Sequence, residues 1–160
     1  MKNFYGFCCL IWTNCRKFPL PLLKPISQLF SLQLCVIGLA PHHVALKKNG
    51  GIVSVDFNVG KLDLSGIKVA GKRKKNAQHF ESNTALYKVL TAEGSYIVRC
   101  CVKGPLLEVN DRLIKQPELL NTMIEGEGYV AIMMPRPADW LKAKASLLDF
   151  ESYKKLRTKQ

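Results

Sequence analysis

Cysteine and histidine are the first candidates for chemistry in this sequence, because both side chains bind metals and act as nucleophiles or bases. Six cysteines and three histidines are present. The three cysteines within residues 8–15 lack the CxxC spacing of zinc sites, and Cys35 stands alone. Cys100 and Cys101 are adjacent, so on a strand they point to opposite faces. This spacing favours free thiols in a reducing compartment and predicts no metal site.

The remaining residues and motifs do not indicate a catalytic arrangement either. His42 and His43 are neighbours that diverge on an extended chain, and no third metal ligand is evident. Glu108, Asp111 and Glu118 suggest an acid–base set, but polar turns are the ordinary place for such carboxylates. No GxSxG, P-loop, GxGxxG after a strand, or HExxH motif occurs. We therefore expect no catalytic residue, no cofactor and no enzymatic activity.

The strongest charge feature is the run Lys72, Arg73, Lys74 and Lys75. Four consecutive cations repel one another and remain solvated, which predicts a loop or a strand end. One interpretation is a solvated loop that only raises solubility; the other is a contact with a polyanion or a nuclear import signal. The formal net charge of +12 attracts nucleic acid, acidic proteins or anionic surfaces without choosing among them.

Segments with a period of two predict a mostly β single domain that carries these residues. The expected strands are 33–39, 53–59, 105–110 and 129–134. In the second of these, Val53, Val55, Phe57 and Val59 alternate with polar residues and are expected to share one buried face. Asn110 and Asp111 are expected to start and cap a short helix over residues 112–115. Asp149 is expected to cap a C-terminal helix that follows another over residues 138–144.

Residues 85–91 and 95–102 form the best predicted hairpin, because both alternate and a short polar turn joins them. Ala92, Glu93 and Gly94 supply that turn, and Gly94 is able to take a positive φ. Glu93 therefore stands at the hairpin tip.

Several motifs carry a resemblance to known proteins. KGPLLEVND, QPELLN, EGEGYVAIMMP and LLDFESYKKL are similar in order and spacing to the glycine cleavage system H-protein, a small lipoyl carrier. From Leu34 to Leu156, with LCVIGLA, VAGKRKKNAQ and VRCCVKGPLLEVN, the chain more closely resembles the Simiate family, also called Abitram or actin-binding transcription modulator. The resemblance implies a barrel-sandwich hybrid fold, mostly β, with short C-terminal helices.

The resemblance also bears on carrier function. In the H-protein the lipoylated lysine lies at the tip of the corresponding hairpin, eleven residues before the glycine that Gly104 matches, and this position is Glu93 here. A carboxylate cannot form the amide that carries lipoate, and the nearest lysine in sequence, Lys88, lies within a strand. We expect Glu93 to be a degenerate lipoyl position.

For function, the resemblance implies a non-enzymatic protein that binds monomeric and filamentous actin and modulates transcription, in nuclear speckles and the cytoplasm. The run from Lys72 to Lys75 matches the family's basic stretch before Ala77 and Gln78, and is the expected partner contact. Nucleic acid remains an alternative partner. An H-protein-like carrier or adaptor in glycine or lipoate metabolism remains the alternative function.

Residues 1–33 form an apolar, basic segment that precedes the domain expected over residues 34–160. The segment imitates a signal or transit peptide but lacks a clear cleavage site and an arginine-rich helix. Residues 25–46 carry no charge apart from histidine, yet their glutamines and prolines make a poor membrane span. Because Simiate proteins begin with a polar, aromatic-rich segment, two interpretations stay open: an organelle-targeting extension or an incorrect gene model.

Overall fold

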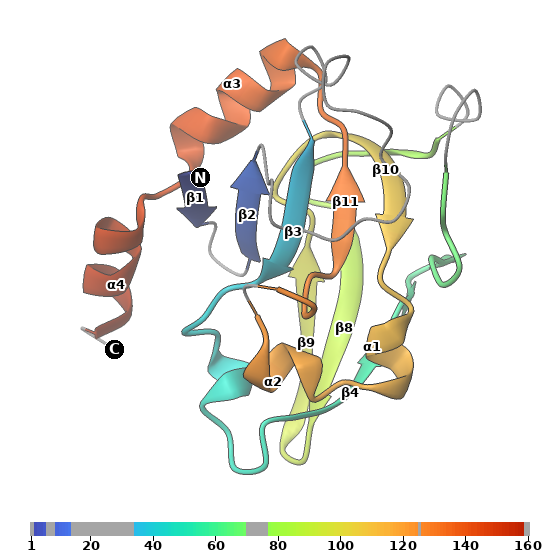
Figure 1. The fold of residues 1–160 in the computed structure, drawn as a ribbon, viewed down its shortest axis with the longest axis vertical. Coiled ribbons are helices and arrows are strands. Elements are labelled where there is room, and N and C mark those ends of the chain that lie inside the picture. The colour runs from blue at the N-terminus through green and yellow to red at the C-terminus, as the bar shows by residue number, and fades with distance from the viewer. Residues whose placement is uncertain (1, 6–8, 14–33, 70–76, 125, 159–160) are drawn as a thin grey trace.

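The computed structural model describes residues 2–5, 9–13, 34–69, 77–124 and 126–158. Within these residues strands dominate, and they form two principal sheets that lie one over the other, with short helices at the margins (Figure 1). The predicted mostly β architecture with short C-terminal helices is confirmed.

The larger sheet has the strand order β1-β2-β3-β11-β10-β7. These strands are β1 (Lys2–Tyr5), β2 (Cys9–Thr13), β3 (Cys35–Leu39), β11 (Ala131–Met133), β10 (Gly104–Val109) and β7 (His79–Phe80). Each pairs antiparallel with its neighbours. The described part of the N-terminal segment thus adds two strands to the sheet, and the predicted strands at 33–39, 105–110 and 129–134 are confirmed.

The smaller sheet has the order β4-β8-β9, formed by β4 (Ile52–Asp56), β8 (Ala85–Thr91) and β9 (Gly94–Arg99). A register shift between Ile52 and Ser54 marks a bulge in β4. The bulge resets the alternation of side chains, so Val53 is 52% exposed while Val55 and Phe57 are buried. The expectation that Val53 shares their buried face is therefore wrong. The chain continues through β5 (Asn58–Val59), which pairs with β6 (Leu62–Asp63).

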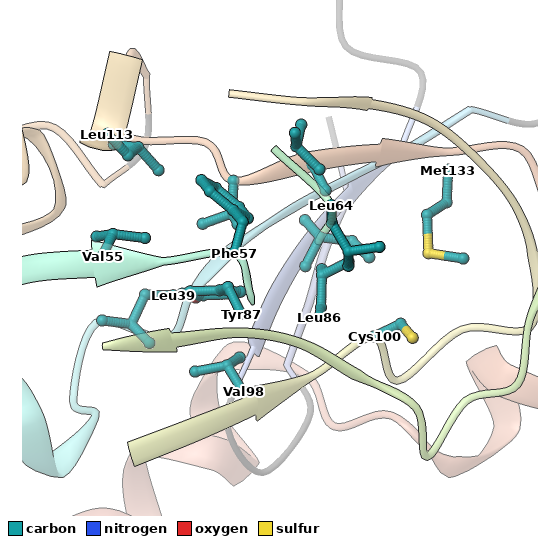
Figure 2. Close-up of a cluster of buried hydrophobic side chains, with 14 of the residues drawn as sticks. Leu39, Val55, Phe57, Leu64, Leu86, Tyr87, Val98, Cys100, Leu113 and Met133 are labelled. Carbon is teal, nitrogen blue, oxygen red and sulfur yellow. The ribbon is translucent and has the colours of Figure 1, made fainter. Parts of the chain in front are cut away.

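The core lies between the two sheets and draws on both. Figure 2 shows apolar side chains from the two layers converging on one cluster, which includes Leu39, Val55, Phe57, Leu86, Tyr87, Val98 and Met133. Burial of such side chains supplies most of the free energy that favours folding. Trp140, from the helix that follows the last strand, joins the same cluster as a buried residue.

Four α-helices and one 3₁₀ helix complete the described residues: η2 (Val44–Leu46), α1 (Arg112–Lys115), α2 (Leu119–Thr122), α3 (Pro137–Ser146) and α4 (Phe150–Thr158). Asp149 caps α4 as predicted, because its carboxylate accepts a hydrogen bond from the Ser152 amide at 2.8 Å. Asp111 does not cap α1. Its carboxylate accepts a hydrogen bond from the Gly66 amide at 2.8 Å, so it fastens a distant loop instead.

Candidate functional site at the hairpin tip and the basic loop

The tip of the β8–β9 hairpin holds Glu93 in a two-residue loop between the paired residues Thr91 and Gly94. The Thr91 hydroxyl donates to the Gly94 carbonyl at 3.1 Å and accepts from the Glu93 amide at 3.3 Å. These side-chain contacts close the turn without a positive φ at Gly94, so the turn does not use the freedom of that glycine.

Glu93 forms an ion pair with Lys48, which lies on the loop after η2. The Glu93 Oε2 to Lys48 Nζ distance is 2.7 Å, and both side chains are partly exposed. The hydrogen bond that Lys48 donates to Glu93 raises the pKa of Lys48 above its ordinary value. Among the described lysines, Lys48 is therefore the one that pairs with the tip, although sequence distance pointed to Lys88.

Lys88 is not available at the tip either. It lies in β8, where its Nζ contacts Asp56 Oδ2 on the paired strand β4 at 3.3 Å. The tip position thus holds a carboxylate that is paired with Lys48, and Lys88 lies away from it within β8, paired with Asp56. The structure places Glu93 where the sequence predicted it, on the hairpin turn.

The basic run from Lys72 to Lys75 lies outside the described residues, but both flanks of its loop are described. Before the loop, the Val69 amide donates to the Leu107 carbonyl at 2.7 Å. After the loop, the Gln78 carbonyl accepts from the Leu106 amide at 2.9 Å. Both stems are therefore anchored on adjacent residues of β10, a strand in the interior of the larger sheet.

A second set of contacts strengthens the first stem. Lys68 bridges to Glu108 of β10, and its Nζ lies 3.5 Å from Glu108 Oε1. The Tyr129 hydroxyl donates to the same carboxylate oxygen at 3.0 Å. Burial and the Glu108 charge together raise the pKa of Tyr129 far above its usual range. Glu108 is thus occupied in holding the stem, not placed in an acid–base set.

The histidines and cysteines are dispersed through the fold. His43 is buried, accepts a hydrogen bond from the Ala45 amide at Nδ1 and packs edge-on against Tyr96, whereas His42 stacks on Tyr153. Among the described residues no group of three potential ligands is placed to hold a metal ion. Cys35 and Cys100 are buried free thiols. No helix in the described residues has both the length and the apolar character to cross a membrane.

Comparison with known proteins decides the family. No protein-family model matches the chain. A protein named Abitram from Drosophila melanogaster is 41% identical over 124 residues, which are 77% of this chain and 57% of that protein. The Abitram proteins of Dictyostelium discoideum and Homo sapiens are 36% and 31% identical, over 69% and 73% of their own lengths. The chain belongs to the Abitram family.

The fold of the Abitram chain is also found in a solved structure. A glycine cleavage system H protein from Mycobacterium marinum superposes with a TM-score of 0.63 at 15% identity, covering 98% of this chain and 97% of that protein. This likeness confirms the predicted H-protein-like barrel-sandwich hybrid fold. The chain spans 57% of the Drosophila relative and about three quarters or less of the others cited.

Sequence reasoning missed the partners of both candidate regions. Lys48 and Glu93 are 45 residues apart, and nothing in the local pattern indicates their pairing. The stems of the basic loop are fixed by hydrogen bonds from Val69 to Leu107 and from Leu106 to Gln78 in or beside β10, 38 and 28 residues apart along the chain. The sequence predicted only that the basic run is a loop or a strand end, which does not indicate the strand that anchors its stems.

Proposed function

We propose that this chain is a non-enzymatic Abitram protein that binds actin, in monomeric and filamentous form, and modulates transcription in the nucleus and cytoplasm. Membership of the Abitram family supports the proposal most directly. The paired Glu93 at the hairpin tip supports it further, because a carrier needs an unpaired amine at that place.

We place the actin contact on the basic loop, Lys72 to Lys75. Eight of the described carboxylates are already occupied within the fold, by ion pairs or by backbone amides: Asp56, Asp63, Glu81, Glu93, Glu108, Asp111, Glu127 and Asp149. The excess of cations is therefore left for external partners, and clustered cations make charge-assisted hydrogen bonds to carboxylates. Anchored stems also reduce the entropy that the loop loses when it binds.

Co-sedimentation of the full chain with filamentous actin, at low and at high salt, tests the proposal. The variant in which Lys72, Arg73, Lys74 and Lys75 are all alanine should bind at least about tenfold more weakly at low salt and lose most of its salt dependence. The matched control removes the same charge from four scattered exposed lysines: Lys47, Lys61, Lys115 and Lys142.

The control should retain most of the affinity if the loop is the contact. Equal losses in the two variants would show that net charge alone drives binding, and absence of binding at both salt concentrations would refute the actin proposal. A fluorescently tagged chain tests localisation: nuclear and speckle fluorescence is expected, and exclusion from the nucleus would contradict the proposed role in transcription.

The H-protein fold favours a second candidate, a carrier or adaptor in glycine or lipoate metabolism, in an organelle. Incubation with a lipoyl ligase followed by intact-mass analysis separates the two. We expect no added mass, because the tip position is Glu93. A lipoyl-sized increase on any lysine would favour the carrier.

A further inference from the structure

The edge of the smaller sheet at β9 is open. β9 pairs with β8 on one side, and among the described residues no strand pairs with its other side. It is six residues long and contains neither proline nor lysine, the residues that commonly block edge strands. Ile97, in its middle, is 51% exposed.

The other edges of the two principal sheets are protected in the described residues. Helix α4 contacts β1 at one edge of the larger sheet (Figure 1), and β7 at the opposite edge is only two residues long. Edge strand β4 contacts α1 and carries the bulge near Val53. Natural proteins use coverage, shortness and bulges to prevent unwanted pairing, and β9 has none of them along its central residues.

The register with β8 fixes which backbone groups of β9 face outward. Thr91 pairs with Gly94 across the two-residue loop, so hydrogen-bonded and non-hydrogen-bonded pairs alternate from there. Ser95 and Ile97 fall in the non-hydrogen-bonded pairs. Their amide N–H and carbonyl groups therefore point toward the open edge, spaced to bind one more extended strand.

The exposed side chains of β9 define the chemistry of that strand. Ser95, Ile97 and Arg99 lie on the solvent face, at intervals of two. Arg99 donates to the Asn83 carbonyl at 2.6 Å and forms no ion pair with any described carboxylate. An added antiparallel strand would place one residue opposite Arg99 and, two residues later, another opposite Ile97.

We propose that the β9 edge is a strand-addition site for an extended acidic segment of a partner protein, in which a carboxylate precedes an aliphatic residue by two positions. The carboxylate would pair with Arg99 and the aliphatic side chain would pack on Ile97, while the backbone supplies most of the affinity. The net charge of +12 favours an acidic partner over a second copy of this chain. The inference is independent of actin binding by the basic loop.

Fluorescence anisotropy of the full chain with a short labelled peptide tests this site. The peptide carries a glutamate two positions before a valine, with threonine elsewhere. Methylation of its alternate backbone amides that face β9 should weaken binding at least tenfold, whereas methylation of the other alternate amides should leave it unchanged. Equal binding of the two methylated peptides would overturn the proposal, whatever the variants below do.

Two protein variants complete the test. Ile97→Pro removes an outward N–H and spares the bonds to β8, and it should weaken binding at least tenfold. Arg99→Glu should reverse the preference for the glutamate peptide, so that a peptide with lysine in place of glutamate binds better. Lys61→Glu is the matched charge control, and it should still prefer the glutamate peptide. Unchanged preference in Arg99→Glu would overturn the proposal. So would a dimer of the unmodified chain that Ile97→Pro converts to a monomer, since a second copy would then occupy the edge.

Discussion

Strands β9 and β10 are both six residues long and both begin with glycine, yet they have opposite environments. β10 lies between β7 and β11, buries nearly every residue and anchors both stems of the basic loop. β9 has one neighbour and exposes Ser95, Ile97 and Arg99. Substitutions in β10 should therefore change the stability of the whole fold, whereas those in β9 should change what the surface binds.

The largest contrast is expected between the two glycines that open these strands. A Cβ on Gly104 would lie 2.8 Å from the Pro135 Cα, and Gly104 has φ +156°, which side chains rarely adopt. Gly104→Ala should lower the free energy of unfolding by about 4 kcal/mol, from backbone strain and overpacking together. A Cβ on Gly94 would meet nothing within 4 Å, so Gly94→Ala should change the free energy of unfolding by less than about 0.5 kcal/mol.

Urea unfolding followed by circular dichroism measures both glycine variants. If Gly104→Ala and Gly94→Ala had similar midpoints, β10 would have enough freedom to move away from Pro135, and the proposed contrast between the strands would fail.

Removal of one aliphatic side chain from each strand should give the next largest difference. Leu106 of β10 is fully buried in the core, so Leu106→Ala should cost about 2–5 kcal/mol by loss of transfer free energy and creation of a cavity. Ile97→Ala should cost less than about 1 kcal/mol, because Ile97 is half exposed. Chemical denaturation at neutral pH measures both, and a cost for Ile97→Ala equal to that for Leu106→Ala would mean that something covers the β9 edge.

The strands themselves were predictable from the sequence because alternation of apolar and polar residues is a local signal. Residues 105–110 and the 85–102 hairpin were placed to within a few residues on this basis. The exposure of Val53 was not predictable from the sequence, because a bulge depends on the partner strand. Asp111 and Glu93 were assigned local roles, but their partners Gly66 and Lys48 are each about 45 residues away, and only the fold brings them together.

A smaller effect is expected at alkaline pH, where the chain passes from exposed β9 back into the core at Cys100. Burial raises the pKa of Cys100, and of Cys35 in β3, from 9.0 to about 12. Below pH 9 both thiols are protonated in the folded and unfolded states, so their contribution to stability is fully present. Between pH 9 and 12 only the unfolded chain loses these protons, so each thiol lowers stability by about 1.4 kcal/mol per pH unit.

Urea unfolding of the Cys100→Ala variant between pH 8 and pH 10.5 isolates one of the two contributions. The variant should be less sensitive to alkaline pH than the unmodified chain, even though truncation lowers its stability at pH 8. Identical slopes would show that the Cys100 thiol ionises as readily in the folded state as in the unfolded one.

The smallest effect on stability is expected at the hairpin tip, where the β9 strand begins. Glu93→Gln removes the ion pair with Lys48, but both side chains are partly exposed and screened by water, so the unfolding midpoint should not change measurably. The pKa of Lys48 should nevertheless fall toward its ordinary value, because the hydrogen bond that Lys48 donates to Glu93 is the main cause of its elevation. NMR titration of the Lys48 ε-methylene group measures this fall, and Glu81→Gln, which breaks the comparable pair with Lys103, is the matched control that should leave Lys48 unaffected. An unchanged Lys48 pKa in Glu93→Gln would mean that the pair is not formed in solution, and the tip would then present a carboxylate free for partners instead of one occupied by its own chain.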